Sequence, residues 1–204
     1  MRTLATLVAV VLLAGCQLQP IDETSGKNFT GFSTKEEAER PIGTDKYSRD
    51  EITAAANKFF GETSQGLARA IEHAFSDYGS PSAYIAGNEG SGAIGVGLRY
   101  GRGDLVYKGG GSREIYWQGP SVGFDVGGNA SRVFTLIYNL HQTYELFQRF
   151  PSVDGSFYLV AGVGVNYQRS GDIVLAPIRT GVGLRAGASV GYVHYTREPS
   201  IIPF

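Results

Sequence analysis

The stretch IGVGLRYG, residues 94–101, decides the fold, and its core GVGLR recurs at 181–185. Ile94, Val96, Leu98 and Tyr100 place bulky side chains on one face of a strand, while glycines and Arg99 occupy the opposite face. The second copy alternates in the same way over 181–192. A glycine face lets a strand curve sharply and lets another backbone approach closely. We therefore expect the bulky faces to fill a small barrel and the glycine faces to help it close.

The repeated glycines do not predict a phosphate-binding loop. A dinucleotide fingerprint needs G-x-G-x-x-G at the start of a helix, and here the third glycine comes one residue late, as Gly101 or Gly187. No helical periodicity follows either copy, and the P-loop pattern does not occur in the sequence. The glycines therefore indicate strands, and nucleotide binding is not expected.

Alternation with a period of two continues from Ala83 to Tyr195, and 23 of the 29 glycines lie between Gly79 and Gly191. One short helical segment is expected within this region, at 141–150. Short strands at close spacing predict a mainly β fold, a small closed or nearly closed antiparallel β-barrel of roughly eight to ten strands. The candidate strands are 83–88, 92–100, 103–109, 113–118, 121–127, 131–139, 156–168, 172–179 and 181–196.

The segment before the strands predicts an N-terminal helix. Ser48 and Glu51 have capping-box spacing, apolar residues then recur at steps of three and four, and Gly79 supplies a stop. Gly61 and Gly66 weaken the middle of this pattern. Two helices with a bend therefore remain an alternative to a single long helix.

The N-terminus predicts a processed and lipidated chain. The apolar run in MRTLATLVAVVLLAGC (1–16) is shorter than the ~20 residues that span a bilayer. Its last four residues, LAGC, resemble the lipobox of bacterial lipoproteins. That resemblance implies a lipoprotein signal peptide at 1–15 and lipid attachment at Cys16, with an ordinary signal peptide as the alternative. Gln17 follows the cysteine, which by similarity to known sorting rules implies the outer membrane.

The remaining chain divides into a tether and one folded domain. Residues 16–46 carry the lipidated cysteine and are then polar, with two prolines and no sustained apolar period, so they predict a flexible tether. Residues 47–204 are expected to form the helix-plus-barrel domain. The predicted protein is anchored in the membrane by its N-terminal lipid and lies in the periplasm.

Charge and composition exclude several classes of function. The formal net charge is −1 and the basic residues are scattered, so a nucleic-acid partner is not expected. Cys16 is the only cysteine, which excludes cysteine catalysis and thiolate metal sites in the domain. His73, His141 and His194 have no metal-ligand spacing. We expect no metal and no cofactor.

Two stretches match the nucleophile-elbow pattern G-x-S-x-G, around Ser121 and Ser189, and His194 follows both serines. The elbow works because its serine sits on a strained turn from a strand into a helix. Both serines here lie in alternating, strand-like sequence. A serine hydrolase is therefore kept as an alternative, and the protein is not expected to be an enzyme.

The stretch YWQGPSVGFDVGGNASR (116–132) contains the only tryptophan and supplies the candidate binding site. Asp and Asn beside paired glycines commonly form a turn, which explains these residue types structurally. The functional interpretation is a polar and aromatic lip at the barrel mouth, with exposed loops near the tryptophan. If Asp125 faces inward it needs a partner, which Arg132 or a barrel arginine such as Arg179 or Arg185 could supply. The candidate ligand- or partner-binding residues are Tyr116, Trp117, Asp125, Asn129 and Arg132.

The runs YWQGPS, FDVGGN and PIRTGVG, in this order, resemble a family of alphaproteobacterial envelope proteins, the envelope integrity protein A family. The resemblance extends from about Tyr47 to Phe204. It implies a small periplasmic β-barrel with a preceding helix, a link to envelope-stress resistance, and no enzymatic activity. TLIYNLHQTYELFQRF (135–150) is also similar, more faintly, to SYLF lipid-binding domains, which implies contact with membrane lipid.

The sequence as a whole predicts a non-catalytic periplasmic lipoprotein that supports cell-envelope integrity and stress resistance by binding an envelope component. A SYLF-like barrel that binds membrane lipid and a serine hydrolase are the alternatives. A transmembrane barrel would need strands of about 9–11 residues, and several expected strands are shorter. The oligomeric state and the identity of the ligand are left open.

Overall fold

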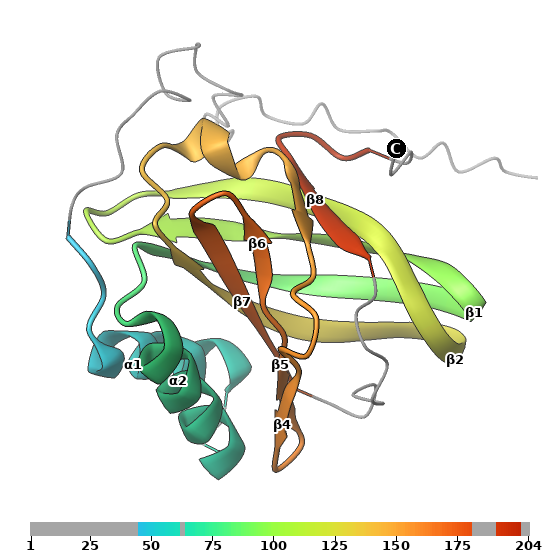
Figure 1. Ribbon diagram of the computed structural model, residues 1–204, viewed down its shortest axis with the longest axis horizontal. Helices are drawn as coiled ribbons and strands as arrows, with labels where there is room; N and C mark the ends of the chain where they lie inside the picture. Colours follow the sequence, from blue (N-terminus) through green and yellow to red (C-terminus); the bar gives the residue numbers. More distant parts are fainter. Residues whose placement is uncertain (1–44, 62–63, 181–190, 201–204) are drawn as a thin grey trace, which may run out of the picture. The chain divides into compact units, whose positions relative to one another are not determined.

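The computed structural model describes residues 45–61, 64–180 and 191–200 (Figure 1). Within two long strands, at 91–96 and 121–130, the description covers the backbone only. In these described ranges, no helix has both the length and the apolar character needed to cross a bilayer. The predicted signal peptide, Cys16 and the tether up to residue 44 lie outside them.

The N-terminal helical segment forms two helices, α1 (Arg49–Phe60) and α2 (Gln65–Tyr78). The predicted capping box is present, because the Ser48 amide donates to the Glu51 carboxylate at 2.8 Å and the Glu51 amide donates to the Ser48 hydroxyl. Gly61 ends α1 in the left-handed conformation, with φ at 77°. The prediction of a single long helix was therefore wrong, and the alternative of two helices is confirmed.

Two very long strands, β1 (Ala83–Tyr107) and β2 (Ser112–Tyr138), form an antiparallel hairpin. Six of the expected strands merge into these two, because the glycines between them bend the strands without ending them. Residues 125–132 lie within β2, so the turn expected there is replaced by continuous strand, with a register shift opposite Ser91 and Ala93. Smaller strands follow: β3 (Arg149–Pro151), β4 (Tyr158–Val160), β5 (Val163–Val165), β6 (Gln168–Ser170), β7 (Ile173–Thr180) and β8 (Tyr192–Thr196).

The short helix expected at 141–150 is reduced to one 3-10 turn, η3 (Thr143–Leu146), followed by β3. Glu145 stabilises this turn, since its carboxylate accepts from the backbone amides of His141 and Gln142. Leu146 and Phe150 are fully buried in the interior of the sheet. The apolar spacing of residues 141–150 therefore arises because a turn and a strand are buried there, and not because one face of a continuous helix is buried.

The sheet curls into a barrel-like ring. One edge of β2 pairs with β8 near Trp117 and with β7 near Leu136, while its other edge pairs with β1. Next to β8 lies β3, and next to β7 lies β6. A bridge between Ser152 and Gln168 joins the end of β3 to β6 and completes the ring. The predicted fold class, a mainly antiparallel β-barrel preceded by helix, is confirmed.

Alternate residues of β2 enter two separate hydrophobic cores. Phe134 and Leu136 face α1 and α2, which cover this side of the sheet (Figure 1). Residues of the neighbouring strands β5 and β7 belong to the same core. Val133 and Ile137 face the barrel interior, where they meet residues of β1, β7 and β8. The C-terminal half of β2 is therefore buried on both faces.

The glycine face of β1 points into the barrel, which reverses the expected orientation. Leu98 and Tyr100 are each 37% exposed, whereas Arg99 between them is buried. The strand bends so far that its two halves meet (Figure 1), and a Cβ at Gly103 would lie 2.6 Å from the Cα of Gly87. A Cβ at Gly101 would overlap the indole of Trp117. The glycine face is the inner one because only glycine leaves room for the contact between the two halves of β1 and for the indole of Trp117.

The contact between the halves of β1 makes a direct prediction. Gly103→Ala places a methyl group 2.5 Å from the carbonyl oxygen of Ala86, and this overpacking should destabilise the fold by about 1–3 kcal/mol. Gly90→Ala in the same strand is the matched control, since its Cβ would meet nothing within 4 Å. Urea unfolding followed by circular dichroism measures both. Equal stabilities of the two variants would contradict the self-contact of β1.

Candidate functional site

Trp117 does not lie in an exposed loop, as the sequence suggested, but inside the barrel. Its side chain is 3% exposed and packs with Tyr195, ring centroid to ring centroid at 6.0 Å. The exposed site expected around this tryptophan was therefore wrong. The reason is the glycine face of β1, which opens space for the indole opposite Gly101. Replacing Trp117 would disturb the core and not a binding surface.

Tyr116 and Arg132 face away from the barrel interior and do not join a common site with Trp117. The Tyr116 hydroxyl donates to the carboxylate of Glu114 at 2.9 Å, and this hydrogen bond raises the tyrosine pKa. Arg132 donates to the carbonyl oxygens of Phe59 and Phe60 at 3.1 and 3.0 Å. These are terminal carbonyls of α1, where a cation complements the helix dipole. Arg132 thus attaches α1 to the sheet.

Asp125 and Asn129 stand in the central part of β2, with their backbones paired to Ala93 and Ser91. Their side chains lie outside the described residues, as does Arg185. Of the arginines expected to pair with Asp125, Arg132 contacts α1 and Arg179 pairs with another carboxylate. The structure therefore does not assemble the five predicted residues into one site.

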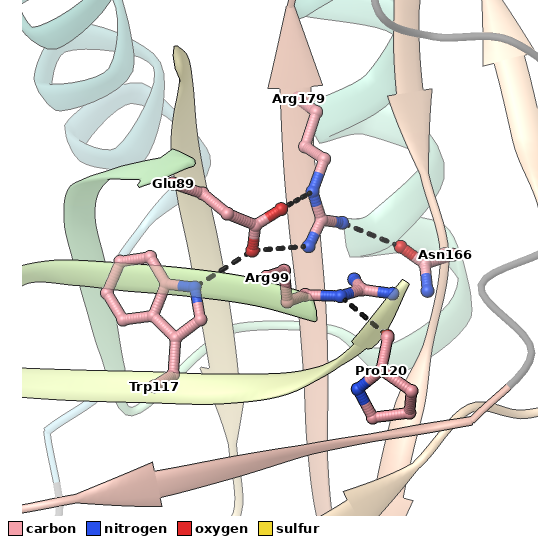
Figure 2. Close-up of polar contacts among 6 residues, drawn as sticks. All are labelled: Glu89, Arg99, Trp117, Pro120, Asn166 and Arg179. Carbon is pink, nitrogen blue, oxygen red and sulfur yellow. Dashed lines mark hydrogen bonds and ion pairs between the residues drawn. The ribbon is translucent and has the colours of Figure 1, made fainter. Parts of the chain in front are cut away.

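A different polar cluster occupies the barrel interior (Figure 2). The Glu89 carboxylate accepts from the indole nitrogen of Trp117 at 2.8 Å and from two nitrogens of Arg179 at 3.3 Å. Arg179 also donates to the side-chain oxygen of Asn166 at 2.9 Å. The four side chains come from β1, β2, β7 and the segment after β5, so the cluster joins the walls of the barrel.

Arg99 brings a second positive charge beside Glu89. Its Nε donates to the carbonyl oxygen of Pro120 at 3.1 Å, and the whole residue is 6% exposed. Figure 2 shows its guanidinium beneath that of Arg179. Burial by itself would raise the pKa of Glu89, but the positive charges of Arg179 and Arg99 outweigh it and hold that pKa below its ordinary value.

The cluster is well suited to holding the barrel together and poorly suited to acid–base chemistry. A general base works best when its pKa lies near the operating pH, whereas the pKa of Glu89 is shifted in the opposite direction. Buried charges require partners, and among the described residues these partners come from strands far apart in the chain. We therefore assign Glu89, Arg179 and Trp117 a structural role.

Sequence reasoning missed this cluster, although a signal for it was present. Arg99 is the one charged residue on the glycine face of residues 94–101, and the sequence suggests Arg179 only as a partner for Asp125. Glu89 lies between two expected strands, where the alternation predicts no direction for its side chain. A single charged residue on the small-residue face of a strand indicates an inward-facing ion pair when that face, and not the bulky one, lines the barrel.

The described structure has an open groove of 460 Å³, which none of the predicted site residues lines. Its lining comes from the segment after β2, the turn η3, Gln148 just before β3, and the loop between β6 and β7 with its flanking residues. Tyr144, one of the lining residues, is 48% exposed. The volume falls within the range of small-molecule sites, about 300–1,000 Å³. Its lining residues are Asn139, His141, Tyr144, Glu145, Gln148, Ser170, Asp172 and Ile173.

Hydrogen bonds hold the polar walls of this groove in place. Gln148 donates to the carbonyl oxygen of Glu145 at 2.6 Å and accepts from the Ser170 hydroxyl at 2.9 Å. The side-chain amide of Asn139 donates to the carbonyl oxygen of Asp172 at 2.9 Å. Asn139 has a positive φ of 59°, a conformation that Asn adopts more readily than most residues. The groove is therefore an organised surface.

The serine-hydrolase alternative receives no support from the described geometry. The Nε2 atom of His73 lies 3.5 Å from a carboxylate oxygen of Asp77, and its ring packs on that of Tyr158 in β4, with 4.0 Å between the ring centroids. In the part of the chain that the structure describes, no group of three or more potential ligands could hold a metal ion. Ser121 is within the continuous strand β2 and not at a strand-to-helix turn, and Ser189 lies outside the described residues.

The buried cluster makes a prediction about pH. Glu89→Gln leaves two buried guanidinium groups without their carboxylate, so it should destabilise the fold by about 3–5 kcal/mol at neutral pH. Because the folded-state pKa of Glu89 is lowered, its contribution is complete above the ordinary carboxyl value of about 4.3 and is lost as the pH falls through the folded-state pKa. The difference between variant and native protein should therefore shrink in acid.

Urea unfolding at a series of pH values measures this difference, with Glu72→Gln on the exposed face of α2 as the control. The control should track the native protein at every pH. A Glu89→Gln variant as stable as the native protein at pH 7 would contradict the role assigned to the cluster.

Comparison with known proteins places the chain. The family described as Envelope integrity protein A matches residues 45–204. A crystal structure described as a beta-barrel-like, uncharacterized protein from Brucella abortus is similar with a TM-score of 0.71 and 48% identity, covering 78% of this chain and 99% of that one. No curated protein matches the sequence. Over its helices and barrel, the chain belongs to the envelope integrity protein A family.

Proposed function

We propose that this protein is a non-catalytic lipoprotein of the periplasm that supports the cell envelope by binding an envelope component in the groove beside η3. Family membership gives the envelope-related role. The observation that carries the binding proposal is the groove itself, an open 460 Å³ site whose polar walls are ordered by their own hydrogen bonds. Walls ordered in advance lose little conformational freedom when a ligand binds.

We propose a non-catalytic role because the Glu145 carboxylate and the Ser170 hydroxyl of the groove make structural hydrogen bonds. The Glu145 carboxylate at the groove accepts from two backbone amides at 3.0 and 2.9 Å, which is a structural task. Nucleophilic catalysis requires a nucleophile within hydrogen-bond reach of an oriented base. The serine hydroxyl in the groove, that of Ser170, donates to the side-chain oxygen of Gln148, and an amide is not a base.

Contact with membrane lipid remains a second candidate function, and one observation favours it. The loop around β4 exposes apolar side chains, with Phe157 at 37% and Leu159 at 49% exposure. β4 is the last strand on its edge of the sheet. In a chain anchored by a lipid at Cys16, this apolar tip would lie within reach of the bilayer surface, where aromatic and aliphatic side chains insert.

The lipid anchor can be tested at its attachment residue. Cys16→Ser removes the thiol that would carry the acyl chains, and each buried CH₂ of such a chain contributes about 0.8 kcal/mol to membrane binding. The variant should therefore move from the membrane fraction to the soluble periplasmic fraction, measured by fractionation and immunoblotting. Exchange of Asn28, elsewhere in the predicted tether, should leave the distribution unchanged. Continued membrane association of the Cys16→Ser variant would exclude the anchor.

The binding proposal can be tested in living cells by photocrosslinking from the groove. The photoreactive amino acid p-benzoylphenylalanine in place of His141 should yield crosslinked adducts in the full-length protein, because His141 is exposed and lines the groove. The same amino acid in place of the exposed Glu72 is the control and should yield fewer. Equal adduct patterns at the two positions would argue against a binding role for the groove.

A further inference from the structure

The groove beside η3 combines an exposed aromatic ring with hydrogen-bonding groups and carboxylates. Tyr144, which is 48% exposed, is one of the residues that line the groove, and the buried Ile173 is the aliphatic member of the lining. Burying an exposed aromatic ring against a ligand yields a large apolar contribution. In a groove that is otherwise polar, the ring suits a ligand with one apolar face and many polar groups around it.

The charge of the groove restricts the ligand further. Glu145 and Asp172 supply two formal negative charges, and the residues that line the groove include no lysine or arginine. Phosphate and carboxylate ligands are recognised mainly by arginine and lysine, so an anionic lipid headgroup would be repelled here. Carboxylates and amide oxygens accept hydrogen bonds. The groove therefore favours a ligand that donates many hydrogen bonds and carries no negative charge.

Polar walls also argue against a protein partner at this place. Protein interfaces have an apolar core surrounded by a polar rim, whereas the groove has one buried aliphatic side chain and an isolated ring. A sugar ring has the complementary chemistry, since its C–H face packs on an aromatic ring while its hydroxyl groups donate to carboxylate and amide oxygens. Gln148, fixed by Ser170 and the carbonyl of Glu145, and Asn139, fixed by the carbonyl of Asp172, would present these oxygens in defined positions.

We infer that the groove binds a neutral or amino-sugar-containing glycan of the envelope, with Tyr144 as the stacking platform. This inference rests on the proposed binding function and names its ligand class. Two envelope materials share the chemistry, the glycan strands of peptidoglycan and the polysaccharide of lipopolysaccharide. The acceptor oxygens come from the two sides of the groove, the turn η3 and the loop between β6 and β7. A saccharide would therefore bridge these two segments.

The inference is tested with the full chain in mild detergent and two separate probes. Purified peptidoglycan sacculi are used for cosedimentation, and delipidated polysaccharide from the same envelope is used for titration calorimetry. Tyr144→Ala should weaken binding to the recognised glycan by about tenfold, the order expected from loss of an aromatic contact. Tyr144→Phe retains the ring and should bind within about threefold of the native protein.

Phe157→Ala is the matched control, because Phe157 is also exposed but lies in the loop before β4, outside the groove. Binding to either probe that depends on Tyr144 and not on Phe157 supports the inference and identifies the source of the glycan. Lack of binding to both probes, or binding that Tyr144→Ala leaves unchanged, overturns it. Thermal unfolding of each variant shows that lost binding is not lost folding.

The two proposals fail in different ways. If photocrosslinking from position 141 captures a protein while both glycan probes stay unbound, the groove is a binding site and the glycan inference is wrong. If position 141 captures nothing beyond the Glu72 control and neither probe binds, both are wrong.

Discussion

Where β1 crosses itself, the backbones at Gly87 and Gly103 lie so close that neither residue has space for a side chain. This approach is possible because the strand remains paired to β2 along almost its whole length while both strands bend together. The bend turns a two-stranded ribbon into most of a barrel wall. The positions of the interior side chains, and the edge on which β7 and β8 join, follow from it.

The ion cluster around Glu89 depends on the same bend. Glu89 lies before the irregular part of β1 and Arg99 after it, yet both enter the interior because they have the same parity along the strand as Gly87 and Gly103. Arg179 reaches them from β7 and Trp117 from β2. Removing a partner from such a buried pair is more costly than the pair is stabilising. The cluster therefore constrains which strands lie next to one another more than it increases stability.

The same architecture separates the interior from the surface that is available for binding. Described side chains fill the interior with an apolar core and a buried polar cluster. The open groove is lined by residues around η3 and around the loop between β6 and β7. The hydrogen bond from Ser170 to Gln148 joins the end of β6 to the segment after η3, and the Ser152–Gln168 bridge joins β6 to the end of β3 nearby. Closure of the ring therefore also helps to shape the groove.

By itself, the sequence determined the fold class, the capping box at Ser48, the stop at Gly79 and the strand character of the glycine-rich runs. These properties are local, since alternation and capping depend on residues a few positions apart. Which face of β1 points inward was decided only by tertiary structure, because alternation has the same period whether glycines line the barrel or cover it. The burial of Trp117 and the meeting of Glu89 with Arg179 likewise depend on the bend. The groove beside η3 unites segments about 30 residues apart, and no local pattern encodes their contact.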